Sequence, residues 1–198
     1  MRWPKLKIAI VTDAWESPVN GVVTTLKATT EELRKMGHHF TILSHIGHKT
    51  IPCPGCQSMR LALFPAEKLI RDLNTVYPDV IHMVTEGPLG MAARQWCLKN
   101  NLTFTSSYHT QFPEYLRLRL PIPTSCTYAW LHRFHSKAIY TLVPTESQKH
   151  GWKIMVFAMS KCGAAVKILK HLILIPQDSE LPQTHNGLYG TYFRWEKY

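Results

Sequence analysis

The stretch of sequence that decides the fold is K-I-A-I-V-T-D-A-W-E-S-P-V-N-G-V-V, residues 7–23. Its first six residues form a short apolar, β-branched run that ends at Asp13, which is typical of a buried strand in a parallel sheet. The loop that follows contains Asn20 and Gly21. Apolar residues at helical spacing then continue over residues 22–36, up to a glycine. This order predicts a strand, a polar loop and a helix.

The same alternation continues to about residue 143. Further strands are predicted at residues 40–43, 79–84, 103–106 and 138–143, and further helices at residues 66–73, 89–100, 114–120 and 123–136. Strands that alternate with helices imply a parallel sheet covered on both faces, and right-handed connections make it a doubly wound α/β layer. Residues 52–65 are expected to be a loop with a short strand around residues 61–63.

The composition is that of a globular protein. The chain has 198 residues, of which 45% are hydrophobic and 18% are charged, and this excludes disordered and fibrous classes. No apolar run approaches the ~18 residues of a membrane span. The apolar run near the N-terminus is too short for the core of a signal peptide, so a cytosolic protein is expected.

Charge and cysteine usage narrow the possible partners. Lysine and arginine outnumber the acidic residues 23 to 13, which suits nucleic acid, an anionic membrane surface or a phosphate-bearing small molecule. The basic residues are scattered, which speaks against nucleic acid. Cys53 and Cys56 form a C-x-x-C pair with no second pair at zinc spacing, so reduced loop and core thiols are expected rather than a metal or redox site.

Ligands of open parallel sheets bind outside the carboxyl ends of the strands, where the strand order reverses. At the first such end, Asn20, Gly21 and Val22 lead into a helix whose first turn has free N–H groups. A phosphate or carboxylate fits such a helix start. The alternative is an Asn-Gly turn before a helix, and this loop alone favours the turn.

The second strand end is V-T-E-G-P-L-G, residues 84–90. Glu86 either accepts a hydrogen bond from a substrate hydroxyl or simply lies favourably near a helix N-terminus, and the residues support both interpretations equally. The third end, T-S-S-Y-H-T-Q-F-P-E-Y, places Tyr108 and His109 after a strand. A histidine there either contacts a bound sugar or acyl group or makes a structural hydrogen bond.

Two further segments have ordinary explanations. T-L-V-P-T-E-S, residues 141–147, offers helix-capping hydroxyls first and ligand contacts second. The basic, aromatic residues 117–135 suit either a membrane surface or, with more weight, a helix with a solvated basic face. His132 and His135 share one helix, but they lack an acidic residue at ligand spacing and are weak zinc candidates.

Seven ordered motifs resemble glycosyltransferase family 4 over roughly residues 6–147. The first is the opening run extended to T-T-L. The others are P-C-P, R-L-A-L-F-P, H-M-V-T-E-G-P-L-G, S-Y-H-T-Q-F-P-E-Y, R-L-P-I-P and V-P-T-E-S. The chain is most similar to the branch of bacterial GDP-mannose-dependent α-mannosyltransferases and sulfoquinovosyl-lipid synthases.

This resemblance implies a GT-B fold, in which two Rossmann-like domains face a cleft. The N-terminal domain mainly holds the acceptor, and the C-terminal domain mainly holds the nucleotide sugar. Such enzymes retain the configuration of the sugar and need no metal or other cofactor. The implied partners are GDP-mannose or a UDP-sugar, a lipid or glycan acceptor and a peripheral membrane surface, with no nucleic acid.

The resemblance also implies roles for residues of this chain. Gly21 and Val22 would face the donor diphosphate through the helix N-terminus, which provides a positive field and N–H donors for the leaving group. His109 would be the catalytic candidate, in contact with the transferred sugar near its reacting carbon. The acceptor-side or sugar-binding candidates are Asn20, Glu86 and Tyr108.

The resemblance stops near Ser147. Residues 1–147 are therefore assigned to an acceptor-side Rossmann-like domain and residues 148–198 to an irregular tail of low order. Back-translation of this tail and translation in a shifted frame permits W-S-R-G-E-D-T-E-A-F-N-P-D-P between residues 162 and 176. This string is the family's usual continuation, so we expect an out-of-frame tail. The alternative is a divergent but genuine C-terminal helix and strand.

The predicted function is retaining hexosyl transfer from a nucleotide sugar to a lipid or glycan, in the cytoplasm or on the inner face of the membrane. Because the donor-binding half is not written in this chain, negligible turnover is expected. One alternative is a non-catalytic acceptor-binding or partner module that is completed by a donor domain in trans. Another is a basic nucleic-acid binder, which no motif supports.

Overall fold

The computed structural model describes residues 5–15, 21–53, 56–109, 123–143 and 154–156. Its helices are α1 (Gly21–Lys35), α2 (Ala66–Val76), α3 (Pro88–Lys99) and α5 (Thr124–His135). Its strands are β1 (Lys7–Thr12), β2 (His39–Ser44), β3 (Thr50–Cys53), β4 (Cys56–Ala62), β5 (Val80–Met83), β6 (Thr105–Ser107), β7 (Tyr140–Val143) and β8 (Ile154–Val156).

The main sheet is parallel and has the order β2-β1-β5-β6-β7-β8. β1 therefore lies between β2, which follows it in the chain, and β5, which comes after the intervening hairpin and α2. The strand order reverses between β1 and β5. This arrangement confirms the predicted doubly wound, Rossmann-like α/β fold, and it predicts a ligand site at the carboxyl ends of β1 and β5.

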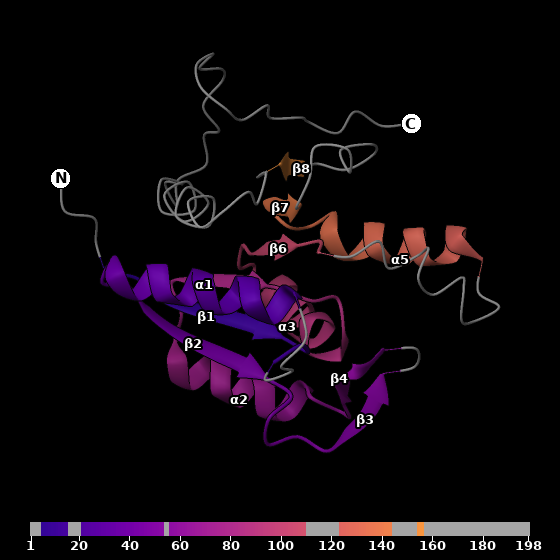
Figure 1. The fold of residues 1–198 in the computed structure, drawn as a ribbon, viewed down its shortest axis with the longest axis horizontal. Coiled ribbons are helices and arrows are strands. Elements are labelled where there is room, and N and C mark those ends of the chain that lie inside the picture. The colour runs from indigo at the N-terminus through magenta and orange to yellow at the C-terminus, as the bar shows by residue number, and fades with distance from the viewer. Residues whose placement is uncertain (1–4, 16–20, 54–55, 110–122, 144–153, 157–198) are drawn as a thin grey trace, which may run out of the picture.

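Helices cover both faces of the sheet (Figure 1). On one face, α1 packs Leu26 and Leu33 against Ile8 and Ile10 of β1. On the other face, the core joins β1 and β5 to α2 and α3, and Phe134 of α5 belongs to this core as well. The alternation of β1 side chains between the two faces explains why this strand is apolar throughout, since it is buried on both sides.

The hairpin of β3 and β4 corrects one prediction. Residues 52–65 were expected to be a loop with a short strand, whereas the structure pairs the two strands antiparallel and places Cys53 opposite Cys56. Pro52 obscured the first strand, because proline is uncommon within strands except at edges. A two-stranded sheet has only edges and accommodates it. The two cysteines of the C-x-x-C pair thus end β3 and begin β4, and Cys53 is buried.

The other predicted elements are confirmed with shifts of a few residues at their ends. The predicted helix over residues 114–120 lies outside the described residues, as does most of the segment after residue 143. Within that segment the structure describes β8, which pairs with β7 in parallel through Leu142 and Met155. No strand was predicted at β8.

Candidate functional site at the carboxyl edge of the sheet

The loops after β1 and β5 are fastened together by the Asp13 side chain. Thr85 Oγ1 accepts a hydrogen bond from the Asp13 backbone N–H at 2.7 Å and donates one to Asp13 Oδ2 at 3.0 Å. Asp13 Oδ1 accepts the backbone N–H of Leu89 at 3.2 Å. Asp13 and Thr85 lie 72 positions apart in the chain. Their hydrogen bonds therefore join the two loops at the point where the strand order reverses.

Asp13 takes the place of an N-terminal cap on α3. The residue before this helix is Gly87, which has no side chain, and Pro88 has no N–H, so Leu89 carries the first free donor of the helix. The Asp13 carboxylate satisfies that donor and lies at the positive end of the helix dipole. Glu86 directly precedes Gly87, and both of its equally weighted interpretations stay predictions.

Two glycines of the motif T-E-G-P-L-G are required by close approach. A Cβ on Gly87 would lie 2.3 Å from Asp13 Oδ2, and a Cβ on Gly90 would lie 2.1 Å from the carbonyl oxygen of Thr85. No side chain fits at either distance. The two glycines therefore allow the loop after β5 to fold around the buried carboxylate.

The Asp13 side chain is inaccessible to solvent, with 0% exposure. Burial raises the pKa of Asp13 from 3.8 to about 6, and hydrogen bonds from Leu89, Thr85 and Gly90 oppose this shift. The negative charge of Glu86 adds to the increase. Below about pH 6 the folded protein therefore favours the protonated carboxyl group.

Glu86, the next acidic residue along this edge, has different partners. Its Oε1 lies 3.1 Å from Nε2 of His135, at the end of α5, and its side chain is 17% exposed while that of His135 is 2% exposed. The Glu86 carboxylate thus lies at the boundary between the interior and the carboxyl edge of the sheet. Its role on the acceptor or sugar side stays a prediction.

His135 is held from behind by hydroxyl groups of two strands. Its Nδ1 lies 2.8 Å from Oγ of Ser106, and that oxygen lies 2.9 Å from Oγ1 of Thr141. All three residues are buried. The result is a continuous chain of hydrogen bonds from β7 through β6 and α5 to Glu86.

Arg94 of α3 fixes the end of α5. Its Nε donates to the carbonyl oxygen of Phe134 at 3.0 Å, and its Nη2 donates to that of Arg133 at 2.7 Å. A buried guanidinium at the negative end of a helix dipole is favourable, and it satisfies carbonyl groups that have no partner within the helix. The position of His135, one residue further on, is thereby tied to α3.

Tyr108 and His109 follow β6 at the same edge. Tyr108 is buried, with 6% exposure, and its ring meets that of His135 edge-to-face with centroids 6.0 Å apart. Burial lowers the pKa of His109, and the Glu86 carboxylate opposes this shift. A neutral His109 is able to accept a hydrogen bond from a sugar hydroxyl, as the candidate role requires.

A second buried histidine supports this edge from within the sheet. His82 of β5 lies across β6, with Nδ1 2.8 Å from Thr105 Oγ1 and Nε2 2.9 Å from Ser107 Oγ. Burial lowers the pKa of His82 to about 3, and the charge of His109 adds to this effect. His82 is therefore neutral near pH 7 and joins two strands through their side chains.

The predicted diphosphate-binding residues lie at the start of α1. Gly21 is the first residue of the helix, and among the described residues outside its own helix turn no atom lies within 4 Å of the place a Cβ would take. Val22 is partly buried against the core on that face. Asn20 lies outside the described residues. The helix start is thus open at Gly21, but the loop before it is not described.

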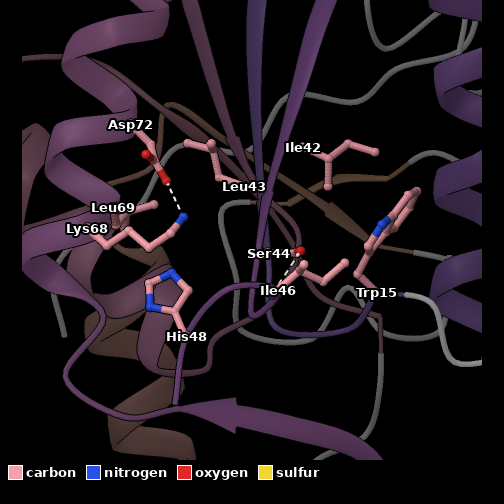
Figure 2. A pocket seen from close by; sticks show the side chains of 9 residues that line it. All are labelled: Trp15, Ile42, Leu43, Ser44, Ile46, His48, Lys68, Leu69 and Asp72. Atoms are coloured by element: carbon pink, nitrogen blue, oxygen red, sulfur yellow. Dashed lines mark hydrogen bonds and ion pairs between the residues drawn. The ribbon is translucent and has the colours of Figure 1, made fainter. Parts of the chain in front are cut away.

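A separate hollow of about 230 Å³ lies at the end of edge strand β2. Figure 2 shows Trp15 and Ile42 on one side of the strand and Lys68 and Asp72 of α2 on the other. Lys68 Nζ and Asp72 Oδ2 are 2.7 Å apart, so the charges of this hollow compensate one another. The candidate residues Glu86, Tyr108 and His109 do not line it.

Two kinds of site are absent among the described residues. No three His, Cys, Asp or Glu side chains in those ranges come together to hold a metal ion. The search for membrane spans, over the same residues, finds no helix that is long and apolar enough to cross a bilayer.

Sequence reasoning missed the residues that organise this edge. Asp13 was read as the end of a strand, and His135 as a weak zinc candidate. Their partners lie 72, 76 and 49 positions away, so no local pattern reveals them. The strand-end rule was the available signal for Asp13, since it is the first polar side chain after β1.

Comparisons with known proteins agree with this architecture. The family model described as Glycosyltransferase Family 4 matches residues 19–153, which is more than half of the chain. The chain belongs to glycosyltransferase family 4. The match ends close to the point at which the motifs of the family end in the sequence.

Three curated relatives are similar to this family 4 chain at low identity. A GDP-mannose-dependent α-mannosyltransferase of Mycobacterium tuberculosis is 22% identical over 158 residues, 71% of this chain and 42% of that protein. Sulfoquinovosyl transferase SQD2 of Arabidopsis thaliana is 28% identical over 63% of this chain and 23% of its own length. An α-monoglucosyldiacylglycerol synthase of Acholeplasma laidlawii is 21% identical over 92% and 46%. The chain thus spans less than half the length of these relatives.

Proposed function

We propose that this chain is the acceptor-side half of a retaining glycosyltransferase that transfers a hexosyl group from a nucleotide sugar to a lipid or glycan. The observation that carries the proposal is the cluster of Glu86, Tyr108 and His109 at the carboxyl edge of a family 4 domain. This edge offers hydrogen-bond acceptors for sugar hydroxyls, and the open helix start at Gly21 offers N–H donors for a diphosphate.

The roles within the proposal follow the chemistry of each residue. His109, neutral because it is buried, contacts the transferred sugar near the reacting carbon. Gly21 and Val22 face the donor diphosphate. Glu86, together with Asn20 and Tyr108, serves the acceptor or sugar side.

The partners proposed are GDP-mannose or a UDP-sugar as donor and a lipid or glycan as acceptor. The names of the relatives support these classes of donor and acceptor, since they include GDP-mannose, a sulfoquinovosyl group and a monoglucosyldiacylglycerol. Residues 1–149 hold 17 basic and 10 acidic residues, and this excess of seven positive charges suits work at the anionic cytoplasmic surface of a membrane, to which the protein would bind peripherally.

We further propose that residues after about 148 are translated out of frame, so that they do not encode the start of the donor-binding half. The shifted-frame string between residues 162 and 176 supports this. Resequencing the locus tests it directly, and an unbroken reading frame with tail peptides confirmed by mass spectrometry would refute it.

The activity is tested by measuring turnover of GDP-mannose and UDP-glucose with two proteins. One is the 198-residue chain, and the other is the product of the gene with its frame restored at residue 148. We expect turnover in the second protein and none above background in the first. Turnover by the first after addition of a separately expressed donor half would instead support completion in trans. Inactivity of the frame-restored protein with every donor and membrane acceptor tested would contradict the proposed transfer.

A further inference from the structure

We propose that His135 is a positioning residue that holds one oxygen of Glu86 and leaves the other to accept a hydrogen bond from a sugar hydroxyl. This inference deepens the proposed function and rests on it for the class of ligand. His135 itself lies behind Glu86, because its side chain is only 2% exposed. It therefore acts through Glu86 rather than by contact with the sugar.

The hydrogen-bond chain fixes the tautomer of His135. A carboxylate oxygen only accepts, so the bond between His135 Nε2 and Glu86 Oε1 requires a hydrogen on Nε2. In the neutral ring Nδ1 is then an acceptor, and Ser106 Oγ donates to it. Because the Ser106 hydroxyl hydrogen is used in this way, Thr141 Oγ1 donates to Ser106 Oγ. Each group in the chain has one direction.

The ring of His135 is confined as well as bonded. Phe134 meets it edge-to-face with centroids 4.9 Å apart, and Tyr108, just after β6, meets it in the same manner. Arg94 holds the last carbonyl groups of α5 just before it. The imidazole is therefore a fixed donor, and a fixed donor restricts the rotation of the Glu86 carboxylate.

The second carboxylate oxygen of Glu86 remains available to a ligand. Within the part of the chain that the structure describes, Glu86 makes its one hydrogen bond to His135. Its side chain is 17% exposed and lies close enough to His109 to affect the pKa of that ring. A half-buried acceptor beside the catalytic candidate suits a hydroxyl of a hexose, and it disfavours a deoxy sugar that leaves the acceptor unpaired.

A matched pair of variants separates positioning from packing. In His135→Gln the side-chain amide nitrogen takes about the place of Nε2 and still donates to Glu86, whereas in His135→Asn it takes about the place of Nδ1 and reaches only Ser106. The probes are methyl α-D-mannopyranoside and methyl α-D-glucopyranoside, titrated into the 198-residue chain and followed by amide chemical shifts. We expect His135→Gln to bind within about twofold of the unaltered chain and His135→Asn to bind about tenfold more weakly.

The melting temperatures of both variants provide the control. If the two variants lose affinity in proportion to their loss of melting temperature, whether or not the new side chain still donates to Glu86, His135 is merely structural and the proposal fails. Failure of the unaltered chain to bind either hexoside would also overturn it, while the transferase proposal would still be decided by donor turnover of the frame-restored protein.

A second measurement needs no variant. Nitrogen-15 spectra of the imidazole rings in the unaltered chain report which nitrogen carries hydrogen. We expect His135 to carry it on Nε2 alone, and Ser106→Ala to reduce this preference. Hydrogen on Nδ1 alone in the unaltered chain would overturn the proposed direction of the hydrogen-bond chain, even if the protein folds normally.

Discussion

The loops after β1 and β5 each place a carboxylate at the same edge of the sheet, and the two carboxylates have opposite uses. Asp13 is fully buried, caps α3 and bonds to Thr85, so both of its carboxylate oxygens already accept hydrogen bonds that stabilise the fold. Glu86 has one oxygen bonded to His135 and is partly exposed. The difference shows that position at a strand end is not enough to assign a ligand role. The partners that a carboxylate already has decide what it is able to bind.

The largest effect is expected from Gly90→Ala, which adds a methyl group where the first turn of α3 packs against the loop after β5. The added Cβ would lie 2.1 Å from the Thr85 carbonyl oxygen, a backbone atom that cannot move independently. We expect the free energy of unfolding to fall by about 3 kcal/mol or more. Chemical denaturation measures it. Gly21→Ala is the control, since among the described residues outside its own helix turn no atom lies within 4 Å of its new Cβ, and it should change stability by less than about 1 kcal/mol.

A smaller effect is expected from removing the Asp13 carboxylate. Asp13→Ala leaves both the Leu89 N–H and the Thr85 hydroxyl hydrogen without an acceptor, so stability should fall by about 2 kcal/mol at pH 7. Asp13→Asn keeps an acceptor and removes a costly buried charge, so it should destabilise less. Equal losses in both variants would show that the negative charge itself is required.

The pH dependence of stability tests the same residue. Burial raises the pKa of Asp13 from 3.8 in the unfolded chain to about 6, so the folded state binds more protons between these values. The contribution of Asp13 to the free energy of unfolding is therefore greatest below about pH 4. It falls by up to about 3 kcal/mol as the pH rises through 6. Asp13→Asn should lack this contribution. If the free energy of unfolding has the same pH dependence in the variant and the unaltered chain, a group other than Asp13 is responsible for it.

The smallest effect on stability is expected from Glu86→Gln. Its amide oxygen still accepts from His135 Nε2, and the side chain is partly exposed, so the unfolding free energy should change by less than about 1 kcal/mol. Affinity for methyl α-D-mannopyranoside should nevertheless fall severalfold, because an amide nitrogen replaces the free acceptor. Unchanged affinity together with a large loss of stability would reverse the roles assigned to Glu86 and Asp13.

Much of the fold was predictable because its helices and strands depend on residues that lie close together in the sequence. The apolar run of β1, the helical spacing of α1 and the proline at the start of α3 each act within a few residues. The hairpin of β3 and β4 was missed because Pro52 argues against a strand, and only the pairing with β4 stabilises that conformation.

The site was predictable in place but not in its connections. The strand-end rule located Glu86, Tyr108 and His109, yet the bond between Glu86 and His135 joins residues 49 positions apart. Whether the end of α5 reaches Glu86 depends on Arg94 and the packing of Phe134, which no periodicity encodes. Asn20 lies in a loop outside the described residues, so its predicted role stays a prediction.

The proposed function requires a sugar to bind at the edge of the sheet where Glu86 and His109 lie. The most direct measurement is a map of amide chemical-shift changes in the 198-residue chain on titration with methyl α-D-mannopyranoside. We predict changes centred on Glu86 and His109, with little change at Trp15 and Lys68 in the hollow beside β2. Changes confined to that hollow, or none at saturating sugar, would contradict the claim.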